Sequence, residues 1–101
     1  MWFTVDILMK SYFLDSGETE LWEECFYLIE AKNLEEVECI AKEIANGEEC
    51  EYLTESGKKI KWEFDSILKF CEIFDGKIGN RTELFSRFLR KQEAESLKIP
   101  F

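Results

Sequence analysis

Residues 34–46 are the single strongly helical stretch in a chain whose other segments alternate as β-strands do. The apolar stripe of this stretch recurs at helical spacing and consists of Leu34, Val37, Ile40, Ala41 and Ile44. Asn33 and Glu36 have the spacing of an N-terminal capping box, and Gly47 is placed to end the helix. A helix of about 13 residues spans roughly 20 Å, so it covers only one face of a sheet, and that only in part.

The remaining segments predict an antiparallel sheet of about five strands. The expected strands are residues 2–14, 21–31, 49–54, 59–74 with a bulge at Asp65-Ser66, and 82–90. The predicted class is α+β in the order β-β-α-β-β-β, with the one main helix on one face. We expect a single domain over residues 1–90 and a tail, 91–101, that forms a short helix. The side of this sheet away from the helix keeps aromatic residues exposed unless something packs on it.

Charge is distributed unevenly along the chain. The net charge is −9, yet Asp15–Glu55 holds 14 acidic and two basic residues, whereas Gly57–Phe101 carries a net charge of +3. Such a molecule is a poor candidate for direct DNA binding or for attachment to an anionic membrane. A basic protein partner fits the charge; the alternative is that the acidic residues only keep an aromatic-rich domain soluble.

Cysteine usage favours a reducing compartment. Cys25, Cys39, Cys50 and Cys71 form no C-x-x-C pair, and the chain has no histidine to complete a mixed zinc site. We expect reduced and mostly buried thiols, with neither metal nor cofactor. There is no signal-peptide pattern and no apolar run near the roughly 20 residues of a membrane helix, so the expected location is the cytoplasm.

The chain lacks the usual parts of a catalytic site. No histidine is available as general base, the five glycines are scattered in turns, and Glu23 and Glu24 point to opposite faces of a strand. We therefore expect no enzymatic activity.

One segment, 81–90, interleaves arginines with aromatic residues. Its candidate binding residues are Arg81, Ser86, Arg87 and Arg90. Arginine beside apolar neighbours suits a phosphate or carboxylate, and aromatic residues suit stacking on a nucleotide base. The alternative, which we favour, is that Arg87 forms an internal ion pair with Glu23 or Glu24.

Two tryptophans and one glutamate on the strands complete the set of candidate residues. Trp22 shares a predicted strand face with Glu24, and Trp62 lies in the most regular alternation of the chain. Tryptophan at such positions is usually core material, and a partner-binding role is the alternative.

The chain resembles a family of bacterial proteins of about 100 residues that is catalogued as a domain of unknown function. The resemblance rests on the run from Leu21 to Glu24, the helix, the Trp62-Glu63-Phe64 strand, and the Glu83–Leu89 segment, and it covers residues 2–90. The family pattern carries a basic residue where this chain has Cys25. The resemblance implies a compact α+β domain and no established activity.

Two functions remain open. The first is a non-catalytic acidic binding protein, most simply an inhibitor or immunity-type antagonist, as in toxin immunity or phage counter-defence. Its partner would be a basic protein, and a homodimer or higher oligomer fits the uncovered sheet face. The alternative is an oligomeric protein that sequesters a nucleotide-like signal through its arginines and aromatic residues.

Overall fold

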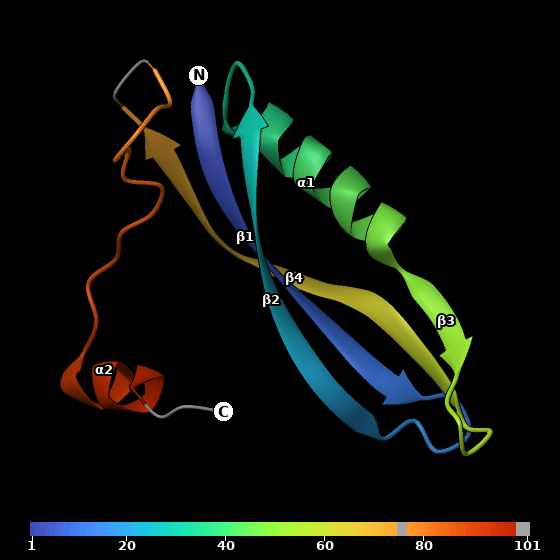
Figure 1. The fold of residues 1–101 in the computed structure, drawn as a ribbon. Coiled ribbons are helices and arrows are strands. Elements are labelled where there is room, and N and C mark those ends of the chain that lie inside the picture. The colour runs from blue at the N-terminus through green and yellow to red at the C-terminus, as the bar shows by residue number, and fades with distance from the viewer. Residues whose placement is uncertain (75–76, 99–101) are drawn as a thin grey trace.

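A computed structural model of the chain describes residues 1–74 and 77–98. Over this part the chain forms a curled four-stranded antiparallel sheet and two helices (Figure 1). The elements are β1 (Trp2–Phe13), β2 (Thr19–Glu30), α1 (Leu34–Glu48), β3 (Cys50–Leu53), β4 (Lys59–Ile73) and α2 (Lys91–Leu97). The strand order is β2-β1-β4-β3, so the two long strands β1 and β4 lie in the centre. The α+β class is confirmed.

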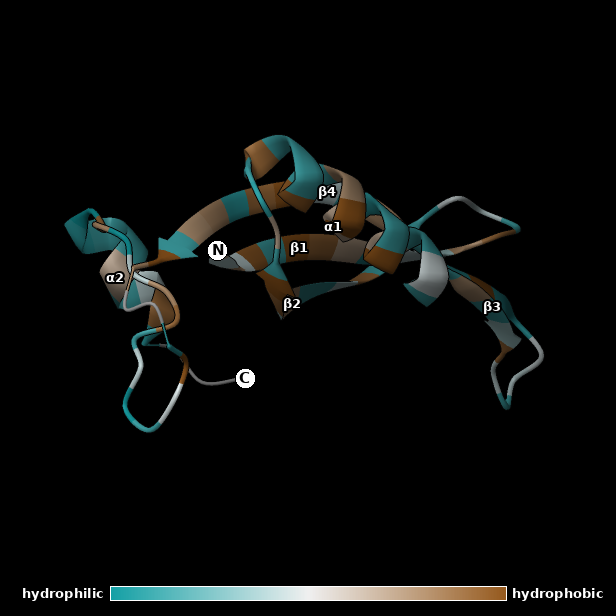
Figure 2. Ribbon diagram, turned by 90° about the horizontal axis from the view of Figure 1, so that it is seen from above, coloured by the Kyte–Doolittle hydropathy of each residue, from teal (hydrophilic) through white to brown (hydrophobic). Residues whose placement is uncertain are grey.

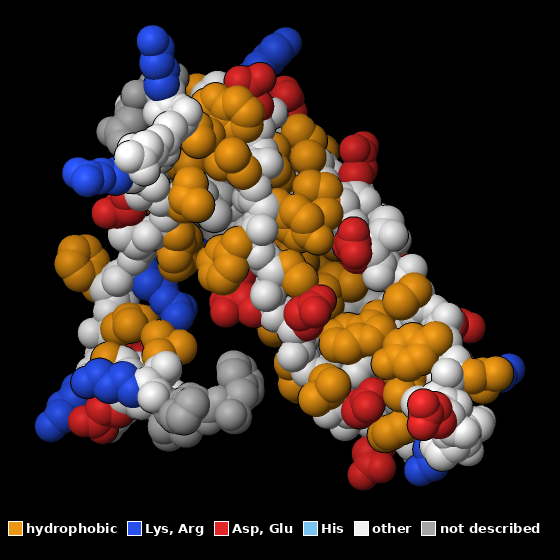
Figure 3. Space-filling model, in the orientation of Figure 1, with side chains coloured by type: hydrophobic (Ala, Val, Ile, Leu, Met, Phe, Trp, Pro, Cys, Tyr) orange, Lys and Arg blue, Asp and Glu red, His pale blue; other side chains and the backbone are white. Residues whose placement is uncertain are grey.

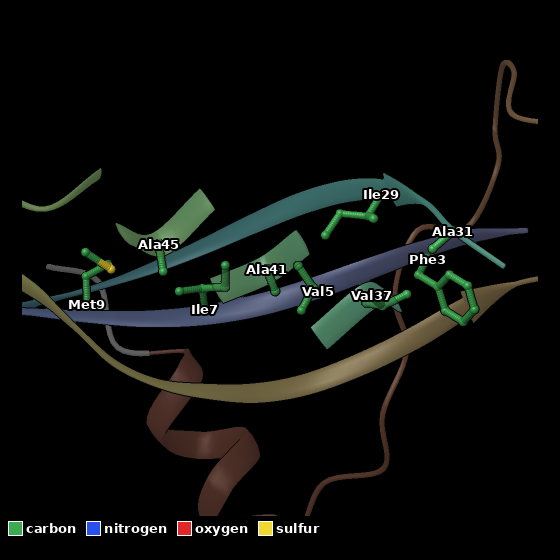
Figure 4. Packing of buried hydrophobic residues seen from close by; sticks show 9 residues of the cluster. All are labelled: Phe3, Val5, Ile7, Met9, Ile29, Ala31, Val37, Ala41 and Ala45. Atoms are coloured by element: carbon green, nitrogen blue, oxygen red, sulfur yellow. The ribbon is translucent and has the colours of Figure 1, made fainter. Parts of the chain in front are cut away.

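The alternation of β1 decides which side of the sheet holds the core. Successive strand residues point to opposite faces, and the odd-numbered side chains of β1 are buried against α1. Figure 4 shows this cluster, which consists of Phe3, Val5, Ile7, Met9, Ile29, Ala31, Val37, Ala41 and Ala45. Apolar residues recur along α1 and along the central strands in Figure 2. The core therefore lies on one side of the sheet.

Helix α1 begins as the sequence predicts and ends differently. The Asn33 side chain accepts a hydrogen bond from the Glu36 backbone N–H at 2.9 Å, which confirms the N-cap. The helix continues through Gly47 to Glu48, so the expected end at Gly47 is wrong. Glu49 has an extended backbone that leads directly into β3, so no left-handed glycine is needed there.

Strand β4 carries the predicted bulge. The pairing with β1 shifts register twice, at Asp65 and at Leu68. The residues on either side of each of these two positions pair with consecutive residues of β1, so Asp65 and Leu68 are left without a partner residue on β1. Such irregularities bend a strand and increase its twist, which agrees with the curl of this sheet.

The expected sheet of about five strands is wrong, because the described residues form a sheet of four strands and a second, short helix accompanies α1. Residues 82–90 form no strand; they run as an irregular segment that leads into α2. Arg81 has a left-handed backbone (φ 70°) at the start of this segment. We ascribe the difference to this turn, which takes the chain away from either edge of the sheet, where it would have had to pair. The predicted helix in the tail is confirmed as α2, and residues 99–101 of the tail lie outside the described residues.

The thiols are less buried than predicted. All four cysteines are free, but Cys39 and Cys50 are exposed, and Cys25 and Cys71 are half-buried. The expectation of mostly buried thiols is wrong because Cys39 lies on the outer side of α1 and Cys50 on the edge strand β3.

Candidate functional site

The side of the sheet opposite α1, here called the open face, carries half-exposed apolar residues. It consists of Thr4, Asp6, Leu8 and Lys10 of β1, Trp22, Glu24, Phe26, Leu28 and Glu30 of β2, and Lys69 of β4. Residues paired across an antiparallel ladder share a face, so the pairing of Asp6 with Phe26 and of Thr4 with Leu28 fixes this set. Trp22, Phe26 and Leu28 retain 54%, 51% and 45% of their accessible surface.

Residues 82–90, here called the arm, cross this face. The Thr4 hydroxyl donates a hydrogen bond to the Leu84 carbonyl, a contact between positions 80 residues apart in the chain. The Phe85 ring packs edge-on against the Phe26 ring, with 5.5 Å between centroids. The Lys69 ammonium lies 5.5 Å from the centroid of Phe85. The arm is thus attached to β1, β2 and β4 over a short stretch.

Phe85 lies above a buried acid. Asp6 pairs with Phe26 on one side and with Lys69 on the other, and Phe85 contacts both of these neighbours. Asp6 is only 1% exposed, and its Oδ1 has no hydrogen-bond partner among the described residues. A buried carboxylate oxygen without a partner is energetically costly. The arm therefore covers a destabilising polar group.

The pKa of Asp6 is raised to about 7, chiefly by burial and in addition by a hydrogen bond to Glu24 and by the negative charge of Glu24. The positive charge of Arg87 on the arm acts in the opposite direction. The Asp6 carboxyl group therefore holds its proton up to near neutral pH. No cluster of three or more His, Cys, Asp or Glu side chains able to hold a metal occurs in residues 1–74 and 77–98.

The structure brings some of the predicted residues together and separates others. Trp22 and Glu24 lie on the open face, and the Lys10 ammonium is 5.9 Å from the Trp22 ring centroid. Arg87 acts on Asp6 from the arm, whereas the favoured ion pair with Glu23 or Glu24 does not form within 4 Å in the described chain. Arg81, Ser86 and Arg90 are exposed.

Trp62 lies on the other side of the sheet. It lines a hollow of about 250 Å³ beside the end of α1, together with Met9, Glu23, Cys25, Glu48 and Cys50. The pKa of the Cys25 thiol is raised to about 11, chiefly by burial and in addition by the hydrogen bond that its Sγ donates to Glu23 Oε1 at 3.2 Å. A thiol that stays protonated at neutral pH is a poor nucleophile.

Sequence reasoning missed four residues of the site: Thr4, Asp6, Lys69 and Phe85. One signal was available, because Asp6 stands between Val5 and Ile7 in the middle of a long apolar strand. An acid at such a position needs a cover or a partner. Which segment supplies the cover depends on the tertiary fold and cannot be derived from the alternation of residues 82–90.

Within the described residues, no helix has the length and apolar character needed to cross a membrane. No curated protein and no solved structure gives a significant match to this chain. One family model does match, over residues 2–86, which extend from β1 through the Leu84 and Phe85 contacts of the arm. The chain belongs to the family described as domain of unknown function DUF4288.

Proposed function

We propose that this protein is a non-catalytic binding protein that docks a protein partner on its open face. The observation that carries the proposal is the row of half-exposed apolar side chains on β2, at Trp22, Phe26 and Leu28. Helix α1 covers the opposite side, and the arm contacts the open face at Thr4, Phe26 and Lys69. A contiguous apolar surface with a polar rim is typical of a protein interface.

The charge around this row favours a basic partner. Glu24 and Glu30 alternate with the apolar residues on the same face, and β2 as a whole carries four acidic residues and no basic one. Complementary charge accelerates association and makes it sensitive to salt. An antagonist that must capture a basic toxin or a defence protein has use for both properties, and this supports the inhibitor or immunity-type role.

The proposed place of action is the cytoplasm, which four free thiols support. The proposed absence of catalysis rests on the missing histidine, and on a Cys25 thiol whose pKa of about 11 keeps it protonated.

Affinity capture with matched variants tests this proposal. The tagged wild-type chain is compared with Trp22→Ser and Leu28→Ser on the open face, and with Leu53→Ser on β3 as the control, since Leu53 is also exposed. A partner captured by the wild type is then purified and titrated by calorimetry at low and high salt. We expect the control to bind as the wild type does, each open-face variant to weaken binding by about tenfold or more, and salt to weaken it further. Equal binding by all four chains, or binding indifferent to salt, contradicts the proposal.

The second candidate is sequestration of a nucleotide-like ligand. The observation that favours it is Phe88, which is fully exposed between the exposed residues Arg87 and Leu89, with Arg90 nearby. An exposed aromatic ring flanked by guanidinium groups suits stacking on a base and pairing with a phosphate.

A thermal-shift panel of mono-, di- and cyclic nucleotides tests this second candidate. A ligand present far above its dissociation constant raises the melting temperature of the wild type, and Phe88→Ala abolishes that rise. If no nucleotide shifts the wild-type melting temperature, the candidate is excluded.

A further inference from the structure

The arm and α2 extend away from the rest of the molecule. Helix α2 has no buried residue and packs against neither α1 nor any strand of the described chain. Phe88 is completely exposed, and Leu97 of α2 is 62% exposed. The radius of gyration is 16.5 Å, compared with about 13 Å for a compact domain of this length. Within residues 1–74 and 77–98, the C-terminal part thus presents exposed apolar side chains.

An open space separates this part from the lower half of the sheet. Figure 1 shows α2 standing apart from β1 and β2, and Figure 3 shows the gap between them in a space-filling view. Trp22 of β2 is about half exposed. Exposed apolar side chains therefore occur both on β2 and in the C-terminal part of the chain.

The C-terminal part of the chain and β2 carry opposite net charge. Residues 81–98 hold five basic and three acidic residues, whereas β2 holds four acidic residues and no basic one. One chain thus carries both halves of a complementary pair, and a second copy of the chain offers the same two halves in return. Two identical chains that exchange such contacts do so about a twofold axis, in which each surface is used twice.

We propose that the occupant of the open face is a second copy of this chain. In the dimer, Phe88 and α2 of each copy pack against Trp22 on the open face of the other. The contacts of Leu84 and Phe85 stay within each chain. This inference rests on the proposed function, because it assigns a partner to the same face; a foreign basic protein then competes with the second copy.

Light scattering on the purified full-length chain tests the dimer. Over a wide range of concentration we expect a mass of twice the 12.0 kDa of the single chain. Phe88→Glu raises the concentration of half-dimerisation by about tenfold or more, because it removes an apolar anchor and adds a charge of the wrong sign. Circular dichroism checks that the variant keeps its fold, which we expect because the Phe88 side chain is fully exposed. Leu53→Glu is the matched control and leaves the dimer unchanged, because Leu53 lies on β3 at the far edge of the sheet.

Two results overturn the inference. One is a single-chain mass at every concentration, and the other is a dimer that Phe88→Glu and Leu53→Glu affect equally. Suppose that the chain has a single-chain mass, captures a foreign protein, and loses this capture in Trp22→Ser. The proposed function then stands, and only the inference that a second copy occupies the open face is rejected. A dimer that Phe88→Glu disrupts, without any foreign partner, supports the inference and confines the function of the face to self-association.

Discussion

The Phe85 ring meets the Phe26 ring edge-on at 5.5 Å and so ties the arm to β2, directly above Asp6. This one contact links three features of the molecule. It holds the arm on the open face, it lies beside the buried carboxyl group of Asp6, and it comes shortly before Phe88 and α2 in the chain.

Phe85→Ala should free the arm and rehydrate Asp6. The pKa of Asp6 is raised chiefly by burial, so it should fall towards its ordinary value of 3.8 when the ring is removed. Loss of a partly buried aromatic side chain should also cost about 1–3 kcal/mol of unfolding free energy. Carbon-detected NMR titration of the Asp6 carboxyl measures the first effect. Phe88→Ala is the control and should leave the Asp6 pKa unchanged; equal pKa values in wild type and Phe85→Ala would refute the covering role.

Asp6→Asn should change how stability depends on pH. An acid whose pKa is higher in the folded than in the unfolded chain binds more protons when folded. Its stabilising contribution is fully present below the ordinary pKa of 3.8 and is lost as pH rises through about 7. Asn cannot ionise and can donate a hydrogen bond to Glu24, so the variant should be more stable at about pH 8, on the order of 1–3 kcal/mol.

Urea unfolding at several pH values measures this difference. As pH rises from about 4 to about 7, the unfolding free energy of Asp6→Asn should increase relative to that of the wild type. Asp15→Asn, at an exposed turn position, is the control, and its unfolding free energy should depend on pH as that of the wild type does. Parallel curves for Asp6→Asn as well would mean that Asp6 titrates normally.

Thr4→Val should loosen the arm while leaving the sheet intact. The substitution nearly preserves shape and removes the hydrogen bond to the Leu84 carbonyl, which is worth about 1 kcal/mol. Hydrogen exchange of the arm amides should then accelerate about fivefold, whereas exchange in β1 and β4 should stay as it is. Thr4→Val combined with Phe85→Ala should be less than additive, because both contacts hold the same segment. If the two substitutions have fully additive effects on the unfolding free energy, the two contacts act independently, and the prediction is wrong.

The four thiols should differ in reactivity. Cys39 and Cys50 are exposed, whereas the Cys25 thiol has a pKa of about 11 because of its burial and its hydrogen bond to Glu23. A disulfide reagent at about pH 8 should therefore modify Cys39 and Cys50 first and Cys25 much later. Mass spectrometry of peptides at successive times identifies the order. In Glu23→Gln the Cys25 thiol should react faster, since a negative charge that disfavours the thiolate is gone.

The local features of the fold could be predicted because their signals are local. The alternation from Phe3 to Met9 is sufficient to define a strand with one buried side, and Asn33 with Glu36 marks the start of a helix whatever surrounds it. The same holds for the bulge at Asp65, where the alternation of β4 breaks. Each of these depends on neighbours within a few positions of the chain.

The arm could not be predicted in this way. Residues 82–90 alternate as a strand does, and only the left-handed backbone at Arg81 and the lack of a paired edge make them an irregular segment. The same limit applies to the site. Thr4 and Leu84 are 80 positions apart, and nothing near Asp6 in sequence indicates that Phe85 covers it. The charge of Arg87 lowers the pKa of Asp6, which lies on β1, whereas the predicted ion-pair partners Glu23 and Glu24 lie on β2.

The central claim is that the open face is an interface, and site-specific photo-crosslinking in living cells tests it most directly. A photo-reactive phenylalanine derivative replaces Trp22 in one chain and Leu53 in another, two exposed positions on opposite edges of the sheet. We predict a strong adduct from position 22, either with a second copy or with a basic protein, and at most a trace from position 53. Adducts of equal yield from both positions, or none from position 22, would contradict the account.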